Sequence, residues 1–112
     1  MAKIEYDGRE LTVGTQTVVL RHKIGQVLEE DGIILVVLSP SQTEGRDQRN
    51  LLAFDEQGNK LWESEIPEHS ERHMFGEIYK ENGDIIGWSW NSNEYKIDLE
   101  TGALENIGYG GK

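Results

Sequence analysis

The sequence predicts an all-β fold, an antiparallel meander of about ten strands in two blade-like sheets that form a sandwich or a partial propeller. Short runs rich in Val, Ile, Leu, Tyr and Trp alternate with turn residues at hairpin spacing, and helical periodicity is hard to find. Asp-Gly and Asn-Gly pairs separate several of these runs. Such pairs are typical of two-residue hairpin turns, which need positive φ at their central positions.

The strands are expected in an order that two irregular segments interrupt. The run from 33 to 38 is apolar at every position, which indicates a central strand covered on both faces. A polar loop at 39–50 contains a proline, a glycine, Arg46 and Arg49, and a second irregular stretch at 66–72 contains Pro67. We expect strands at 3–6, 10–13, 17–21, 25–29, 33–38, 51–55, 60–63, 75–80, 84–90, 94–99 and 103–107.

The chain of 112 residues is expected to form a single domain that contains an internal repeat. Residues 27–63 and 78–107 share one order of strands and glycine turns, and they differ mainly in the connector at 39–50. A lone sheet of this kind cannot bury both faces, so the two sheets must cover each other or a partner. The N-terminal strands at 3–21 could supply further cover. Asp55 and Asp98 occupy matching turns, where each carboxylate can accept backbone N–H bonds.

Two hairpins carry a resemblance to a known family. The phrase NLLAFDEQGNKLWE (50–63) resembles the run that closes each blade of quinoprotein-type (PQQ-repeat) β-propellers, and EYKIDLETGAL (94–104) resembles the same hairpin without its tryptophan. The resemblance implies blade-like sheets. Two blades cannot close a propeller, which typically has four to eight, so we carry over no cofactor site and expect no cofactor. In size, charge and folding style the chain also resembles small acidic bacterial immunity proteins that neutralise toxins.

The net charge is −10, from 21 acidic and 11 basic residues. This charge disfavours some classes of binding partner and favours others. Binding to nucleic acid phosphates or to an anionic membrane needs the opposite sign, so neither is expected. A basic protein is the partner that such a field attracts, although acidity also serves solubility alone. The chain has no cysteine, no apolar leader and no long apolar run, which favours the cytoplasm.

Catalytic and metal-binding motifs are weak. His69 and His73 have the spacing of a zinc pair on a helix, but Pro67 interrupts that stretch and no third ligand follows at a suitable spacing. The acidic clusters coincide with turns, where carboxylates are ordinarily solvated. We therefore expect no catalytic residue and no metal site.

The aromatic residues are candidates for the core and for a binding surface. Trp88 and Trp90 are two apart in one strand and should project from one face. With Trp62 and Phe54 of the first repeat unit they are expected to form the core between the sheets, and the alternative is that one or two of them line a recognition surface. We expect a non-catalytic protein-binding module, in its most concrete form an immunity-type inhibitor of a basic toxin, acting as a monomer or small homo-oligomer. The alternative is a small-ligand-binding protein or minor enzyme with a pocket between the two blades. The candidate binding residues are Trp88, Trp90, Tyr79, Tyr95, Glu77, Glu81, Glu94, Arg46 and Arg49.

Overall fold

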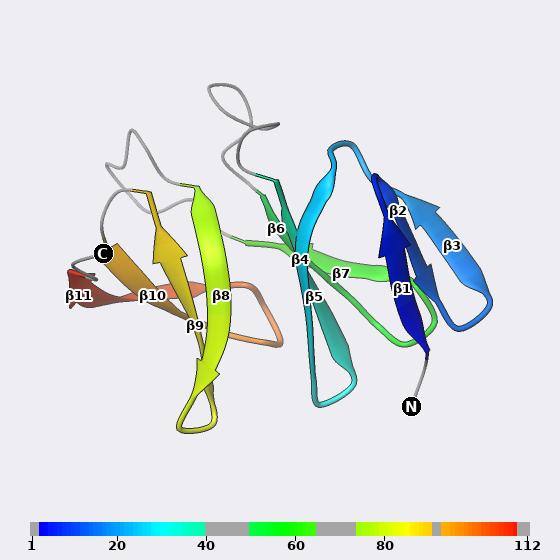
Figure 1. The fold of residues 1–112 in the computed structure, drawn as a ribbon. Coiled ribbons are helices and arrows are strands. Elements are labelled where there is room, and N and C mark those ends of the chain that lie inside the picture. Colours follow the sequence, from blue (N-terminus) through cyan, green and yellow to red (C-terminus); the bar gives the residue numbers. More distant parts are fainter. Residues whose placement is uncertain (1–2, 40–49, 65–73, 91–92, 110–112) are drawn as a thin grey trace.

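A computed structural model describes residues 3–39, 50–64, 74–90 and 93–109, and in these ranges it contains eleven antiparallel strands (Figure 1). The described residues include no helix long and apolar enough to cross a membrane. The strands are β1 (Ile4–Asp7), β2 (Glu10–Val13), β3 (Gln16–Val19), β4 (Ile24–Glu30), β5 (Ile33–Leu38), β6 (Leu51–Phe54), β7 (Lys60–Glu63), β8 (Phe75–Glu81), β9 (Asp84–Ser89), β10 (Asn93–Ile97) and β11 (Leu104–Tyr109).

The strands form three meander sheets, which we name sheet A (β1–β3), sheet B (β4–β7) and sheet C (β8–β11). Sheet B lies between the other two, and the chain passes from sheet A to sheet C in sequence order (Figure 1). The predicted all-β antiparallel meander is therefore confirmed. The two predicted sheets correspond to sheets B and C, and the N-terminal strands add a third sheet that covers the far face of sheet B.

Sheet B is buried on both faces because β5 is apolar at every position. Alternate residues of a strand point to opposite faces. Leu35 and Val37 join Phe75 and Ile78 of sheet C in one apolar cluster. Ile34, Val36 and Leu38 belong to a second cluster with Leu11 and Val13 of sheet A. The prediction of a central strand covered on both sides is confirmed.

Most of the predicted hairpin turns have the expected backbone. Asp31 and Gly32 both have positive φ (51° and 78°), as do Asn82 and Gly83 (51° and 86°), which fits turns with two left-handed central residues. The prediction of the same turn at Asp7-Gly8 is wrong. Asp7 stays in β1 and pairs with Glu10, so the turn is made by Gly8 and Arg9.

Two side-chain amides connect sheet B to the first strand of sheet C. Gln26 Nε2 donates to the carbonyl of Ile78 (2.7 Å), and the Ile78 N–H donates to Gln26 Oε1 (3.0 Å). Asn50 Nδ2 donates to the carbonyls of Leu38 (3.1 Å) and Phe75 (2.8 Å), while the Phe75 N–H donates to Asn50 Oδ1 (2.9 Å). The two amides thus replace the backbone partners that β8 lacks on this edge, and they fix its position against sheet B.

Trp62 of β7 seals the other end of the interface between sheets B and C. It is 8% exposed, and its Nε1–H donates to the carbonyl of Leu99 (2.8 Å). Gly102, with φ +80°, lies under the ring, where a Cβ would be 2.5 Å from Trp62 Cε3. The prediction of core aromatics between these sheets holds for Trp62, but Phe54 packs on the opposite face of sheet B, against sheet A.

Glu63 links sheet B to the segment between β3 and β4. Its carboxylate lies 3.0 Å from Arg21 Nη2 and 2.7 Å from Lys60 Nζ. Burial raises the pKa of Glu63, but the hydrogen bonds from Lys60 and Arg21 outweigh it and hold the pKa below its usual value. A carboxyl with a lowered pKa stabilises the fold above its unfolded pKa, and this contribution is lost as the pH falls through the folded value.

We predict that Asn50→Ala lowers the free energy of unfolding by about 3 kcal/mol, because it leaves buried backbone groups of Leu38 and Phe75 without partners. Chemical denaturation checks this value. Gln57→Ala, which changes an exposed turn residue, should stay within about 0.5 kcal/mol of the wild type. Equal losses in the two variants would show that the Asn50 amide does not connect the sheets.

Candidate functional site

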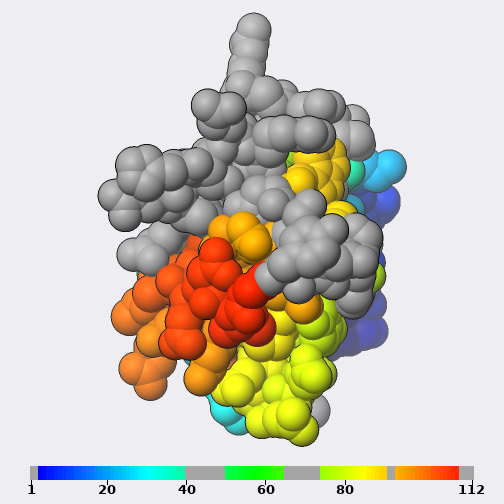
Figure 2. All heavy atoms as spheres, turned by 90° about the vertical axis from the view of Figure 1, so that its left-hand side faces the viewer, coloured from blue at the N-terminus to red at the C-terminus, as the bar shows by residue number. Residues whose placement is uncertain are grey.

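Sheet C has one face against sheet B and an outer face that no other described strand covers (Figure 2). Strand register decides which residues lie on this outer face. Trp88 in β9 pairs with Glu77 of β8 on one side and with Glu94 of β10 on the other. Residues directly opposite each other share a face. One tryptophan therefore lies between two glutamates on neighbouring strands.

The two tryptophans lie together over a glycine of β8. A Cβ on Gly76 would be 3.0 Å from Trp88 Cζ3 and 3.2 Å from Trp90 Nε1. Register shifts between Phe75 and Glu77, so Gly76 is the extra residue of a β-bulge. The prediction that Trp88 and Trp90 share a face is confirmed. That face is the outer one, and neither residue belongs to the apolar clusters between the sheets, so the expectation that they form the core there is wrong.

Trp88 also has a polar group without a partner. Its Nε1 is shielded from solvent, yet no described residue supplies it with a hydrogen-bond acceptor. A buried donor left unpaired costs about 1–3 kcal/mol. The indole is therefore held against β8 with one unmet hydrogen bond among the described residues.

Tyr79 extends the outer face along β8. Its hydroxyl donates a hydrogen bond to Glu94 Oε2 on β10. This bond is the main cause that raises the pKa of Tyr79 to about 12, and desolvation and the negative charges of Glu94, Glu81 and Glu77 act in the same direction. The protonated phenol donates to the Glu94 carboxylate and so restricts where that carboxylate lies.

The predicted residue Tyr95 does not belong to this face. It pairs with Gly87, and its ring is 4% exposed in the interface with sheet B, in edge contact with Phe75 (centroids 6.3 Å apart). The reason is strand alternation, since Tyr95 follows Glu94 and must point the other way. A Cβ on Gly87 would be 2.4 Å from Phe75 Cε1, so that glycine makes room for the buried rings. Arg46 and Arg49 lie outside the described residues.

The outer face of sheet C is acidic. Lys96 is the basic residue among its described members, and it lies 3.5 Å from Asp84. Lys80, by contrast, points to the inner side and pairs with Glu30 of sheet B (2.6 Å). The carboxylates that share the outer face by strand register are Glu77, Glu81, Asp84, Glu94 and Glu105.

The outer face of sheet A provides a comparison. It carries Glu5, Glu10 and the hydrogen-bonded pair Thr12 and Thr17 (3.2 Å between hydroxyl oxygens), and its apolar member is Val19. In the described chain this face is therefore also acidic, but it lacks large aromatic side chains. Among the two outer faces, only that of sheet C combines aromatic surface with carboxylates.

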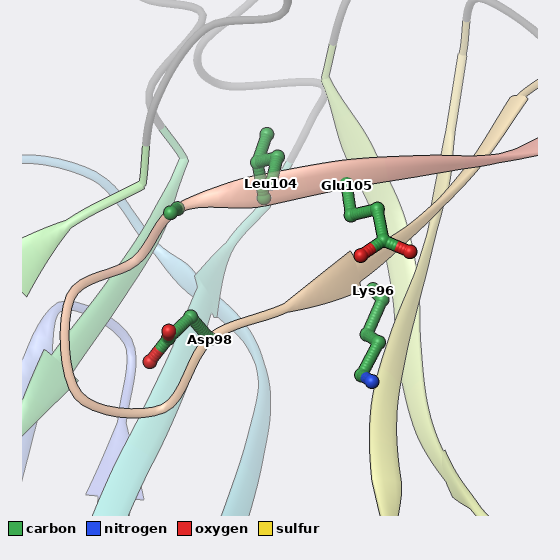
Figure 3. Close-up of a pocket in the computed structure, with 5 residues that line it drawn as sticks. Lys96, Asp98, Leu104 and Glu105 are labelled. Carbon is green, nitrogen blue, oxygen red and sulfur yellow. The ribbon is translucent and has the colours of Figure 1, made fainter.

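A shallow depression of about 340 Å³ lies beside the hairpin of β10 and β11 (Figure 3). Lys96 and Glu105 face each other across the two strands, and Asp98 lies at the hairpin. The Asp98 carboxylate accepts a backbone N–H from Glu100 (2.8 Å), and Asp55 does the same for Gln57 and Asn59 (2.9 Å each) in the matching turn. Both turn predictions are confirmed, so these carboxylates have a structural role.

The described residues hold no group of three side chains that could bind a metal ion, and His69 and His73 lie outside those residues.

Gly76 is a site residue that was not predicted from the sequence. A lone glycine inside an expected strand signals a bulge or a close approach, and it could have indicated that the Trp88 ring lies against β8. Asp84, Lys96 and Glu105 also lie on the outer face of sheet C but were not predicted to do so, because strand pairing decides which face of the sheet each side chain joins.

We predict that Glu94→Gln lowers the pKa of Tyr79 from about 12 toward its ordinary value of 10.0. A raised tyrosine pKa contributes stability that is complete below the unfolded pKa and is lost as the pH rises through the folded value. Titration of tyrosinate absorbance, with Tyr79→Phe to assign the signal, measures the shift. The control Glu105→Gln removes the same charge from the same face, and an equal shift in both variants would argue against a direct hydrogen bond.

The chain was compared with protein-family models, with curated proteins and with solved structures. A family model described as a domain of unknown function (DUF7957) matches residues 1–109. No curated protein matches. Among solved structures, the chain is similar to the crystal structure of the computationally designed Ika8 protein, with a TM-score of 0.59 and 11% sequence identity.

The match to the designed protein covers 97% of this chain and 34% of that chain, so the chain spans about a third of its length. At this identity the likeness concerns the fold alone. The family model, in contrast, covers nearly all of the sequence. The chain therefore belongs to the DUF7957 family, a domain of unknown function.

Proposed function

We propose that this protein is a non-catalytic protein-binding module that binds a basic protein through the outer face of sheet C. In its most concrete form it is an immunity-type inhibitor that covers a basic toxin domain in the cytoplasm. The observation that carries the proposal is the row Glu77–Trp88–Glu94, which lies across three neighbouring strands on a face that no described sheet covers.

The composition of this face suits association with a cation-rich surface. Carboxylates at the rim of an interface raise the rate of association with a basic partner, and large aromatic side chains near its centre slow dissociation. Trp88 and Trp90 supply the aromatic surface, and Gly76 beneath them lets both rings lie close to the backbone. Rings that are already held in place lose little freedom on binding.

The comparison of the two outer faces favours sheet C over sheet A. Both faces are acidic, so charge alone would attract a basic partner to either. Only sheet C adds aromatic area, and aromatic residues dominate the binding energy of protein interfaces. The alternative function, with a ligand pocket between sheets B and C, gains no such support, because apolar side chains pack the described part of that interface.

We predict that a basic protein is retained from native lysate by the wild-type chain but not by the triple variant Glu77→Gln, Trp88→Ala and Glu94→Gln. After the partner is identified by mass spectrometry and purified, calorimetry should show affinity at least about 100-fold weaker for the variant. The wild-type affinity should also fall as salt is added, because screening weakens the attraction between exposed charges.

The matched control is Glu5→Gln, Glu10→Gln and Val19→Ala, which removes two charges and one exposed apolar side chain from the outer face of sheet A. It should bind as the wild type does. Retention of the same protein by both variants, or retention of partners that are not basic, would refute the proposal.

A further inference from the structure

We propose that Glu77, Trp88 and Glu94 form a recognition site for one arginine side chain of the partner. This inference rests on the proposed function and specifies the group that the outer face of sheet C binds. The guanidinium would lie over the Trp88 ring and donate hydrogen bonds to the carboxylates on either side.

The planar arrangement of its donors favours a guanidinium over an ammonium at this site. Neighbouring strands lie about 4.8 Å apart, so Glu77 and Glu94, two strands apart, leave the sheet with their backbones about 10 Å apart. A guanidinium is planar and presents donors on opposite edges, so it can bridge two carboxylates across a ring. An ammonium is a compact point charge and lacks this fixed, planar arrangement of donors.

The two carboxylates lack a cation of their own in the described chain. Lys96, two residues after Glu94 on the same face, pairs with Asp84. Lys80 pairs with Glu30 on the other side of the sheet. No ion pair within the described residues involves Glu77 or Glu94, so an incoming cation does not have to displace one.

The site is held in shape before binding. Tyr79 donates to one oxygen of Glu94, which fixes that carboxylate and leaves its second oxygen for another donor. The Trp88 ring is held against Gly76. A cation over a tryptophan face is favourable by about 0.5–1 kcal/mol at exposed sites. Side chains that are already held in place lose less conformational entropy on binding, so less of this energy is offset.

The unpaired Nε1–H of Trp88 is a second observation that points to a ligand. It is a buried donor on the same ring, and it needs an acceptor that the described chain does not supply.

The test is nuclear magnetic resonance of the full chain titrated with N-acetyl-arginine amide. We expect shifts at the Trp88 indole N–H and the Gly76 amide, and binding at least about threefold tighter than N-acetyl-lysine amide. N-acetyl-citrulline amide has nearly the shape of the arginine probe without its charge, and it should bind at least about fivefold more weakly than the arginine amide.

A variant pair separates the site from general attraction to an acidic protein. Glu77→Gln with Glu94→Gln should abolish the preference for arginine, whereas Glu5→Gln with Glu10→Gln, which removes the same charge from sheet A, should preserve it. All four substitutions change residues that contribute to neither apolar cluster, and the amide spectrum verifies folding.

The inference is overturned if the arginine probe causes no shift at Trp88, or if the lysine or citrulline probe binds equally well. Either result leaves the proposed function standing when the partner still binds through the outer face of sheet C. Arginine binding at Trp88 without any basic protein partner would instead support the site and contradict the proposed function.

Discussion

The hydrogen bonds of Gln26 and Asn50 to β8 determine how sheet C is placed, and the candidate site depends on that placement. Each amide both donates to and accepts from the backbone of β8, as a neighbouring strand would. The first strand of sheet C is thereby fixed beside sheet B, with Phe75 and Ile78 turned inward. Because side chains alternate along a strand, the same constraint turns Glu77 and Tyr79 outward, and β9 and β10 follow by register.

The two ends of the stack of sheets differ in chemistry, although both are acidic. Sheet A ends in carboxylates, threonines and one valine, which water solvates readily. Sheet C ends in carboxylates with Trp88, Trp90 and Tyr79, and aromatic surface of this kind on an outer face is typical of interaction sites. The bulge at Gly76 increases the difference, because it allows both indoles to lie against β8.

Local signals in the sequence were sufficient for the strands, since hairpin turns and β-rich runs are short-range features. The limits of β2, β5 and β7 agree with those expected, and the turns at Asp31 and Asn82 have the expected backbone. The residues that a side chain contacts in a neighbouring sheet or strand were harder to predict. Trp62 and Trp88 look alike in sequence, yet one is sealed by Gly102 and the other lies over Gly76. Tyr95 was assigned to the wrong face although it directly follows Glu94 in one strand, where alternation alone sends the two side chains to opposite faces.

Trp88 and Trp90 lie on an acidic face that no described strand covers, whereas Trp62 is sealed in the core, and the candidate site depends on this difference. Fluorotryptophan labelling gives one fluorine resonance for each ring, and single Trp→Phe variants assign them. Broadening by a cationic and an anionic paramagnetic probe then reports both access and the sign of the local field. The account predicts stronger broadening of Trp88 and Trp90 by the cationic probe and little effect of either probe on Trp62. Equal protection of all three rings, or stronger broadening of Trp88 by the anionic probe, would contradict it.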